Sequence, residues 1–140
     1  MIKQLSVFLP NKPGILANFT ELLEKNSINI RALTVADTVD YGILRVIVNN
    51  PDKCIQVLKN ANYMVSETEV IAVEVEDKPG GLRKIAKLMG DNGVNIEYIY
   101  STLTTSAAII LIRVNNNEKA EKLFQKASIK LLQGEELYTI

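Results

Sequence analysis

The chain has 140 residues, one cysteine, no histidine, and equal numbers of basic and acidic residues, 16 of each. A neutral chain without runs of like charge is a poor partner for nucleic acids or anionic membranes, which bind clustered lysine and arginine. One cysteine excludes an internal disulfide and no apolar run reaches the roughly 20 residues that span a bilayer, so we expect a cytoplasmic protein.

The first half of the chain alternates between strand and helix patterns. Residues 2–9 alternate apolar and polar side chains, which predicts a strand that follows no signal peptide. A turn at 10–14 leads into an amphipathic helix that ends near residue 25. Strands are expected at 28–35 and 43–48, with a turn at 37–42 between them. Pro51 opens a second helix, and residues 63–75 are extended.

The second half repeats this order. We expect a strand at 70–75, a helix stopped by Gly93, strands at 94–102 and 107–114, a helix through 120–127, and a final strand within 129–138. Each half is therefore βαββαβ, the ferredoxin-like order. The predicted fold class is α+β, with two ferredoxin-like units in tandem, antiparallel sheets, and helices on one face. We expect one domain at 1–68 and another at 69–140.

Two motifs recur 66 positions apart. Asn11-Lys12-Pro13-Gly14 returns as Asp77-Lys78-Pro79-Gly80, and the sequence NSINI at 26–30 returns as NGVNI at 92–96. Units of about 70 residues have marginal cores and gain from packing against a twin. Our alignment places a two-residue gap at 104–106 and so matches Arg45 with Arg113. For both arginines an ion-paired or solvated role is favoured over anion binding.

Each proline-glycine turn lies where a strand is followed by a helix. The start of a helix offers free amide N–H groups and the positive end of the dipole, which together stabilise a carboxylate. Gly14 and Gly80 allow close approach to the backbone. We place Asn29 and Asn95, which begin the next strand, at the sheet end nearest the turn. Side-chain carboxamides on either side of the helix dipole suit a zwitterionic amino acid, because a carboxamide can both donate and accept hydrogen bonds.

A structural interpretation of the turns remains open. Proline and glycine before a helix often form only a turn, and an Asn or Asp there is often a cap. Duplication would copy such a turn whether or not it binds anything, so the two copies are not independent evidence for a site.

These residues resemble the signature of ACT domains, and the whole chain resembles two such domains in tandem. The resemblance rests on residues 11–16 with 26–30, and on 77–82 with 91–96. It implies a protein that binds a small regulatory molecule, most often an amino acid, between two domains. The implied ligand contacts are Asn11, Gly14, Ile15, Leu16 and Asn29 in the first copy, and Asp77, Gly80, Gly81, Leu82 and Asn95 in the second. Asn29 and Asn95 would reach the ligand from the partner domain.

Two features refine this expectation. Some serine-binding members of the family carry a histidine just before the turn, where this chain has Leu9 and Val75, so an apolar amino acid is favoured. Residues 107–112 are apolar on both faces of a strand that should alternate, which indicates a covered sheet and a homodimer.

The sequence predicts a non-catalytic regulatory protein. The alternative is a free-standing regulatory subunit that docks on an amino-acid biosynthetic enzyme and confers feedback control. Ferredoxin-like phosphatases use an arginine in the first turn, and neither turn here contains one. Histidine is absent and no set of metal ligands is visible, so we expect no catalytic residue, no cofactor and no metal.

Overall fold

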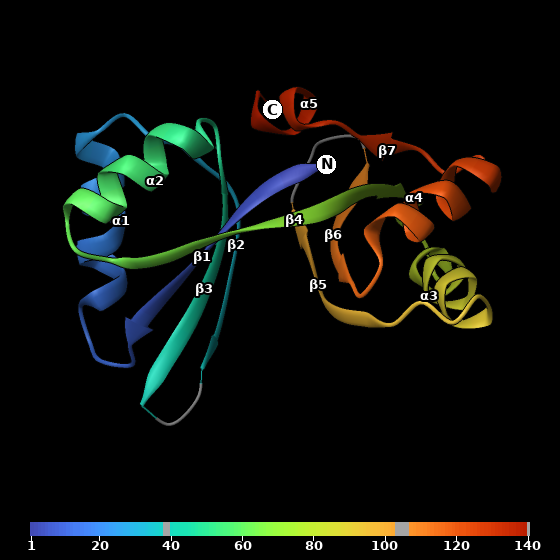
Figure 1. The fold of residues 1–140 in the computed structure, drawn as a ribbon, viewed down its shortest axis with the longest axis horizontal. Coiled ribbons are helices and arrows are strands. Elements are labelled where there is room, and N and C mark those ends of the chain that lie inside the picture. Colours follow the sequence, from blue (N-terminus) through green and yellow to red (C-terminus); the bar gives the residue numbers. More distant parts are fainter. Residues whose placement is uncertain (38–39, 103–106, 140) are drawn as a thin grey trace. The chain divides into compact units, whose positions relative to one another are not determined.

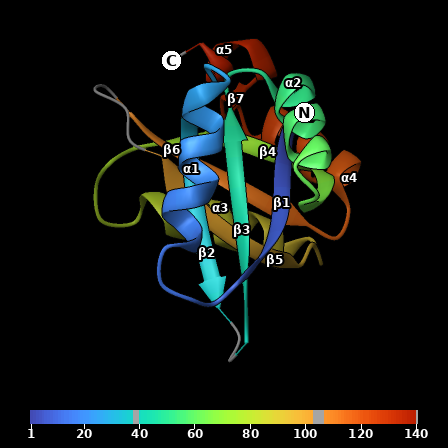
Figure 2. The same cartoon turned by 90° about the vertical axis from the view of Figure 1, so that its left-hand side faces the viewer.

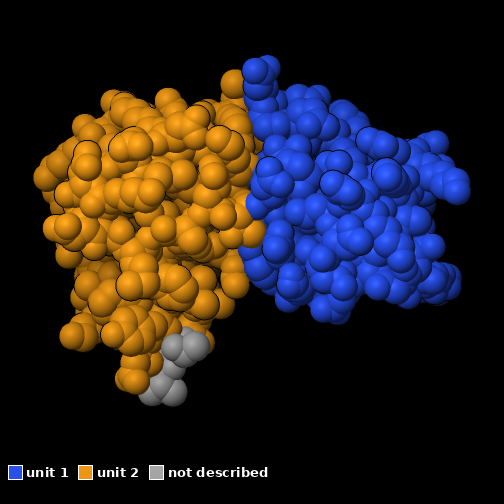
Figure 3. Space-filling model, in the orientation of Figure 1, with its two compact units in different colours: residues 1–2, 69–136 blue, residues 3–68, 137–140 orange. Residues whose placement is uncertain are grey.

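The computed structural model describes residues 1–37, 40–102 and 107–139, traced as a ribbon in Figure 1. They form two compact units, coloured separately in Figure 3. The N-terminal unit, in orange, contains residues 3–68 and the end of the chain from Leu137 on. The C-terminal unit, in blue, contains Met1, Ile2 and residues 69–136. The two ends of the chain are thus exchanged between the units.

The N-terminal unit is a four-stranded sheet with two helices on one face. Its elements are β1 (Ile2–Pro10), α1 (Ile15–Lys25), β2 (Ile30–Asp37), β3 (Tyr41–Val48), α2 (Pro51–Asn60) and the start of β4 (Met64–Val75). The strand order is β2-β3-β1-β4. Figure 2 shows α1 and α2 in front of this sheet. Phe19 and Leu23 of α1 and Leu58 of α2 pack with Leu5 and Val46 in its core.

The C-terminal unit repeats this arrangement. Its elements are the end of β4, α3 (Gly81–Asp91), β5 (Ile96–Thr102), β6 (Ala108–Val114), α4 (Asn117–Lys126) and β7 (Leu131–Leu132). The strand order is β5-β6-β4, with β7 paired to the free side of β4. Its core joins Ile85 and Met89 of α3 with Phe124 of α4 and with Val73 and Ile112 of the sheet. The predicted pair of ferredoxin-like units is therefore confirmed.

The end of the chain differs from the prediction. We expected a strand within 129–138, but the strand is only Leu131–Leu132, and α5 (Gly134–Tyr138) follows it. The amide of Gln133 donates to the Glu136 carboxylate at 2.7 Å, which is half of a capping box. Acidic residues at 135 and 136 also favour the start of a helix. This local capping ends the strand early.

The strand registers correct our alignment of the two halves. Val35 pairs with Leu44 in one unit, and Ser101 pairs with Ile110 in the other, so the same offset of 66 holds on both sides of the hairpin. There is no two-residue gap, although residues 104–106 themselves lie outside the described part of the chain. Arg45 is consequently equivalent to Leu111 and not to Arg113.

Arg113 has the ion-paired role that the sequence favoured. Its Nε lies 3.6 Å from the Glu97 carboxylate, and its Nη1 donates to the carbonyl oxygen of Glu69 at 3.1 Å. These contacts join β6 to the neighbouring strands, so the guanidinium stabilises the sheet.

The apolar strand β6 is buried on both sides. Leu111 and Ile112 have no exposed surface, and their side chains point to opposite faces of the sheet. The burial matches the absence of polar alternation in its sequence. Among the helices in the described residues, none has the length and apolar character needed to cross a membrane.

Candidate functional site

The two glycine turns hold their glycines in the left-handed region. Gly14 has φ 85° and Gly80 has φ 90°, and these residues are the N-caps of α1 and α3. A Cβ built on either glycine would meet nothing within 4 Å. The backbone conformation, and not crowding, is therefore what calls for glycine here, and the space beside each turn is open.

The start of α1 leaves two amides without an acceptor. The amide of Asn18 is the first to bond in the helical pattern, to the carbonyl of Gly14 at 3.0 Å. Gly14 itself offers no side-chain cap. Within the described residues, the N–H groups of Leu16 and Ala17 have no hydrogen-bond partner. They point out of the helix start, where the dipole is positive, and can receive a carboxylate.

The start of α3 has the same form. The amide of Lys84 donates to the carbonyl of Gly80 at 3.2 Å, and no side chain caps the helix. Leu82 and Arg83 accordingly carry the unpaired N–H groups among the residues that the structure describes. The sequence prediction named the first residue of each pair, Leu16 and Leu82, and missed Ala17 and Arg83. The signal was available, because the first bonded amide lies four residues beyond the N-cap.

The other two long helices are capped by the chain itself. Asn50 accepts a hydrogen bond from the amide of Lys53 at 3.2 Å at the start of α2, and Asn116 accepts one from the amide of Lys119 at 3.1 Å at the start of α4. Their first turns also contain an acidic residue, which α1 and α3 lack. The starts of α1 and α3 therefore have neither a capping side chain nor an acidic residue in the first turn to compete with an anion, whereas the starts of α2 and α4 have both.

Gly81 has a reason of its own to be glycine. A Cβ at this position would lie 2.2 Å from the carbonyl oxygen of Glu76. The equivalent residue in the N-terminal unit is Ile15, whose side chain packs against the core. The absence of a side chain at Gly81 thus follows from the tighter turn in the C-terminal unit.

The charges beside the two turns also differ. Glu76 and Lys78 form an ion pair next to Gly80, which lowers the pKa of the Glu76 carboxyl and raises that of the Lys78 amine. Pro10 stands at the position equivalent to Glu76, so the N-terminal unit has no such pair there. Asn11 and Asp77 are both exposed beside their turns.

Our placement of Asn29 and Asn95 relative to the turns was wrong. Pro10 pairs with Tyr41 at one end of β3, whereas Ile30 pairs with Val48 at the other end. Seven residues of strand separate these ends, which is about 23 Å. Asn29 therefore begins β2 at the sheet end far from Gly14 of its own unit.

The far end of each sheet is closed by a pair of asparagines. The amide of Asn29 donates to Asn49 Oδ1 at 3.0 Å, and the amide of Asn49 donates back to the carbonyl of Asn29 at 3.0 Å. Asn95 and Asn115 repeat this pair, with a distance of 3.0 Å in one direction and 3.2 Å in the other. In both cases the backbone of the predicted site residue is already bonded, and its exposed side chain is what a ligand would contact.

No metal centre is found in the part of the chain that the structure describes. No three histidine, cysteine, aspartate or glutamate side chains come together there in a group that could hold an ion.

Two tandem βαββαβ units, each with a glycine turn after its first strand, define a class of paired ferredoxin-like domains. Residues 1–140 match the ACT domain pair family, and the chain belongs to that family. A curated relative from Archaeoglobus fulgidus, described as a probable acetolactate synthase small subunit, is 33% identical over 69 residues. That match covers 47% of this chain and 43% of the relative, so it spans less than half of the relative's length.

Solved structures share the whole architecture. A crystal structure of a Bacteroides thetaiotaomicron protein has a TM-score of 0.94 and 39% identity, over 99% of this chain and 96% of that one. The ligand-free regulatory subunit of aspartate kinase from Thermus thermophilus has a TM-score of 0.69 and 18% identity, over 90% of each chain. The second likeness concerns the fold alone.

Proposed function

We propose that this protein is a non-catalytic regulator that binds an amino acid through the open starts of α1 and α3. The observation that carries the proposal is that α1 and α3 begin with free amides and have neither a side-chain cap nor an acidic residue in the first turn, whereas α2 and α4 have both. The ligand carboxylate would accept hydrogen bonds from Leu16 and Ala17, or from Leu82 and Arg83. Membership of the ACT domain pair family supports the same function.

The ligand that we propose is an amino acid with an apolar side chain. Leu16 and Leu82 are exposed beside the free amides, and the residues just before the two turns, Leu9 and Val75, are apolar. Asn11 and Asp77 are placed to contact the amino group. The proposed contact residues also include Gly14, Ile15, Asn29, Gly80, Gly81 and Asn95.

A site that combines a glycine turn with Asn29 or Asn95 needs a second ACT domain. Within one unit the turn and the asparagine lie at opposite ends of the sheet. We propose that the ligand lies between two ACT domains and that a homodimer in the cytoplasm is the binding form. Removing the carboxamide by Asn29→Ala or Asn95→Ala would then weaken ligand binding in a dimer without changing the fold.

The experiment that tests the function is a thermal-shift and calorimetric screen of the twenty amino acids. A ligand that binds only the folded state raises the midpoint by mass action. We expect a response to leucine, isoleucine or valine at micromolar to millimolar concentration. A flat response to all twenty at millimolar concentration would contradict the proposal.

Matched variants identify which turn is used. Gly14→Asp places a carboxylate where the ligand carboxylate would bind, whereas Gly14→Ala adds a Cβ at the same left-handed position without the charge. If the N-terminal turn binds, the aspartate variant loses binding and the alanine variant keeps part of it. Gly80→Asp and Gly80→Ala form the corresponding pair for the C-terminal turn.

A second function is favoured by the similarity to a probable acetolactate synthase small subunit. We propose as the alternative that this chain docks on an amino-acid biosynthetic enzyme and confers feedback control. Analytical ultracentrifugation of the purified chain mixed with an acetolactate synthase catalytic subunit would reveal a complex. If no complex forms with or without added amino acid, this alternative fails for that enzyme.

A further inference from the structure

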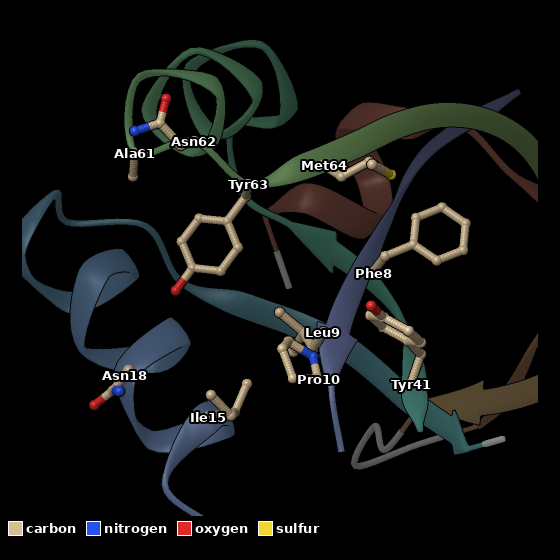
Figure 4. A pocket seen from close by; sticks show the side chains of 10 residues that line it. All are labelled: Phe8, Leu9, Pro10, Ile15, Asn18, Tyr41, Ala61, Asn62, Tyr63 and Met64. Carbon is tan, nitrogen blue, oxygen red and sulfur yellow. The ribbon is translucent and has the colours of Figure 1, made fainter. Parts of the chain in front are cut away.

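The N-terminal unit contains a pocket of about 560 Å³ beside the start of α1. It lies where the end of β1, the first turn of α1, the start of β3 and the connection from α2 to β4 come together (Figure 4). Its volume is within the range of about 300–1,000 Å³ that is typical of small-molecule sites. The full lining is Phe8, Leu9, Pro10, Ile15, Asn18, Tyr41, Ala61, Asn62, Tyr63 and Met64.

The pocket lining is largely apolar, and three of its large side chains are exposed. Phe8 is 43% exposed, Tyr41 58% and Met64 69%. In Figure 4 the rings of Phe8 and Tyr41 lie on one side of β1, and Leu9, Ile15 and Tyr63 lie on the other. Leaving apolar surface in water costs about 25 cal/mol per Å², so three such side chains around one hollow favour an apolar occupant.

One wall of the pocket is held in place by the core. The ring of Tyr63 meets the ring of Phe19 edge to face, with centroids 5.8 Å apart and an angle of 79° between the planes. Phe19 is fully buried, so this contact fixes the tyrosine ring. The pocket is therefore partly formed before any ligand arrives.

In the C-terminal unit, the region equivalent to this pocket is charged and not apolar. The residues equivalent to Phe8, Tyr41 and Met64 are Glu74, Ala107 and Lys130. Lys130 Nζ lies 3.0 Å from Glu74 Oε2, so an ion pair replaces the phenyl ring and the thioether. The corresponding hollow is smaller, about 370 Å³, and charged side chains line it. The exposed apolar lining is consequently a property of one unit and not of the fold.

The polar groups of the pocket indicate the charge of the ligand. None of its ten lining residues is acidic or basic, and the only amides in their side chains belong to Asn18 and Asn62. Carboxamides donate and accept hydrogen bonds without a charge. An amino acid zwitterion or a phosphate would find no counter-ion among these side chains, whereas a neutral ring with one polar atom would be satisfied.

We propose that this pocket is a second binding site, present only in the N-terminal unit, for a neutral small molecule with an aromatic ring or a branched aliphatic chain. The site adjoins the amino-acid site of the proposed function, with which it shares Ile15, but it does not use the free amides of α1. The ion pair of Glu74 with Lys130 closes the equivalent place in the C-terminal unit to such a ligand.

The test uses indole as a neutral aromatic probe and the full chain labelled with ¹⁵N. We expect titration with indole to shift amide signals around Phe8, Tyr41 and Tyr63 and to leave those around Glu74 and Lys130 in place. The double variant Phe8→Glu/Met64→Lys gives the pocket the two charged side chains that the C-terminal unit has at the equivalent positions. Because both side chains are exposed, it should fold, and its affinity for indole should fall about tenfold or more.

The reciprocal variant Glu74→Phe/Lys130→Met is the matched control. It removes the ion pair and should add indole-dependent shifts in the C-terminal unit while those in the N-terminal unit remain. Tyr41→Ala is a milder variant that should weaken indole binding without introducing charge. Unchanged indole affinity in Phe8→Glu/Met64→Lys, or indole shifts confined to the C-terminal unit, would overturn the proposal.

Two further measurements distinguish this pocket from a protein interface and from the amino-acid site. If Phe8→Glu/Met64→Lys abolishes self-association in ultracentrifugation and the unmodified chain does not bind indole, the apolar lining is a protein interface and the proposal is wrong. Gly14→Asp should leave indole binding intact. Loss of amino-acid binding with retained indole binding in this variant would therefore support two separate sites. If the unmodified chain binds indole but none of the amino acids, the proposed function fails and this pocket stands.

Discussion

Cys54 of α2 lies fully buried in the core of the N-terminal unit. Burial raises the pKa of its thiol to about 11, because the thiolate would lose its hydration. We therefore predict that iodoacetamide labels the folded protein at pH 8 far more slowly than it labels the urea-unfolded chain, as mass spectrometry can follow. Equal labelling rates in the two states would show an accessible thiol.

The same shift gives a pH dependence of stability. The folded-state pKa of Cys54 is raised above its ordinary value of 9.0, so its contribution is complete below pH 9 and is lost as the pH rises toward 11. We expect the free energy of unfolding in urea to fall over this range more steeply in the unmodified protein than in Cys54→Ala. Parallel curves for the two proteins would contradict this assignment.

Two glycines of one helix should respond to alanine in opposite ways. Gly81→Ala would force a Cβ to 2.2 Å from the Glu76 carbonyl oxygen, and we expect a loss of about 1–3 kcal/mol. Gly90 has open space in the same helix, so Gly90→Ala should stabilise by about 1 kcal/mol. Thermal and urea unfolding of both variants would check the signs, and a stabilised Gly81→Ala would refute the close approach.

At the scale of elements, the four long helices divide into two capped and two open ones. Asn50→Ala and Asn116→Ala each remove a side-chain cap and should cost about 1 kcal/mol. Asn11→Ala, beside the open start of α1, should change stability by less than about 0.5 kcal/mol. Urea denaturation of the three variants measures the contrast. A similar loss in Asn11→Ala would mean that this asparagine stabilises the turn.

The elements were predictable where periodicity and local chemistry agree. Pro51 at a helix start and Gly93 beyond a helix end, with φ 71°, are both confirmed. Ser27 is the residue of the N-terminal unit that is equivalent to Gly93, and it also has a left-handed backbone conformation, with φ 55°. The conformational preference of serine did not indicate this. The last strand was predicted too long, because an apolar pattern does not show that the Glu136 carboxylate caps a helix in the same segment.

The candidate site was predictable in part for a related reason. Sequence placed the turns and their glycines correctly, since both are local features. The prediction placed Asn29 at the wrong end of the sheet, because it did not take the length of α1 into account. The 11 residues of this helix bring the chain about 16 Å back along the sheet before β2 begins. The pocket around Phe8, Tyr41 and Met64 was missed altogether, because its lining comes from strands that are distant in sequence.

At the scale of the whole molecule, the end of the chain completes the N-terminal unit. Leu137 is fully buried, the hydroxyl of Tyr138 accepts from the amide of Lys3 at 2.8 Å, and the carbonyl of Tyr138 accepts from Arg31 Nε at 2.8 Å. We predict that Leu137→Ala destabilises by about 2–5 kcal/mol. Hydrogen exchange should then accelerate at Lys3 and along β1. Faster exchange in the C-terminal unit alone would contradict this prediction.

The exchanged chain ends also affect how the protein is made. A ribosome releases the N-terminal repeat first, and domains usually fold in that order as they emerge. Here Lys3 and Arg31 receive their partner Tyr138 only after the C-terminal repeat has been synthesised. The N-terminal repeat therefore stays incomplete during the synthesis of its twin, and its last contacts form after that synthesis.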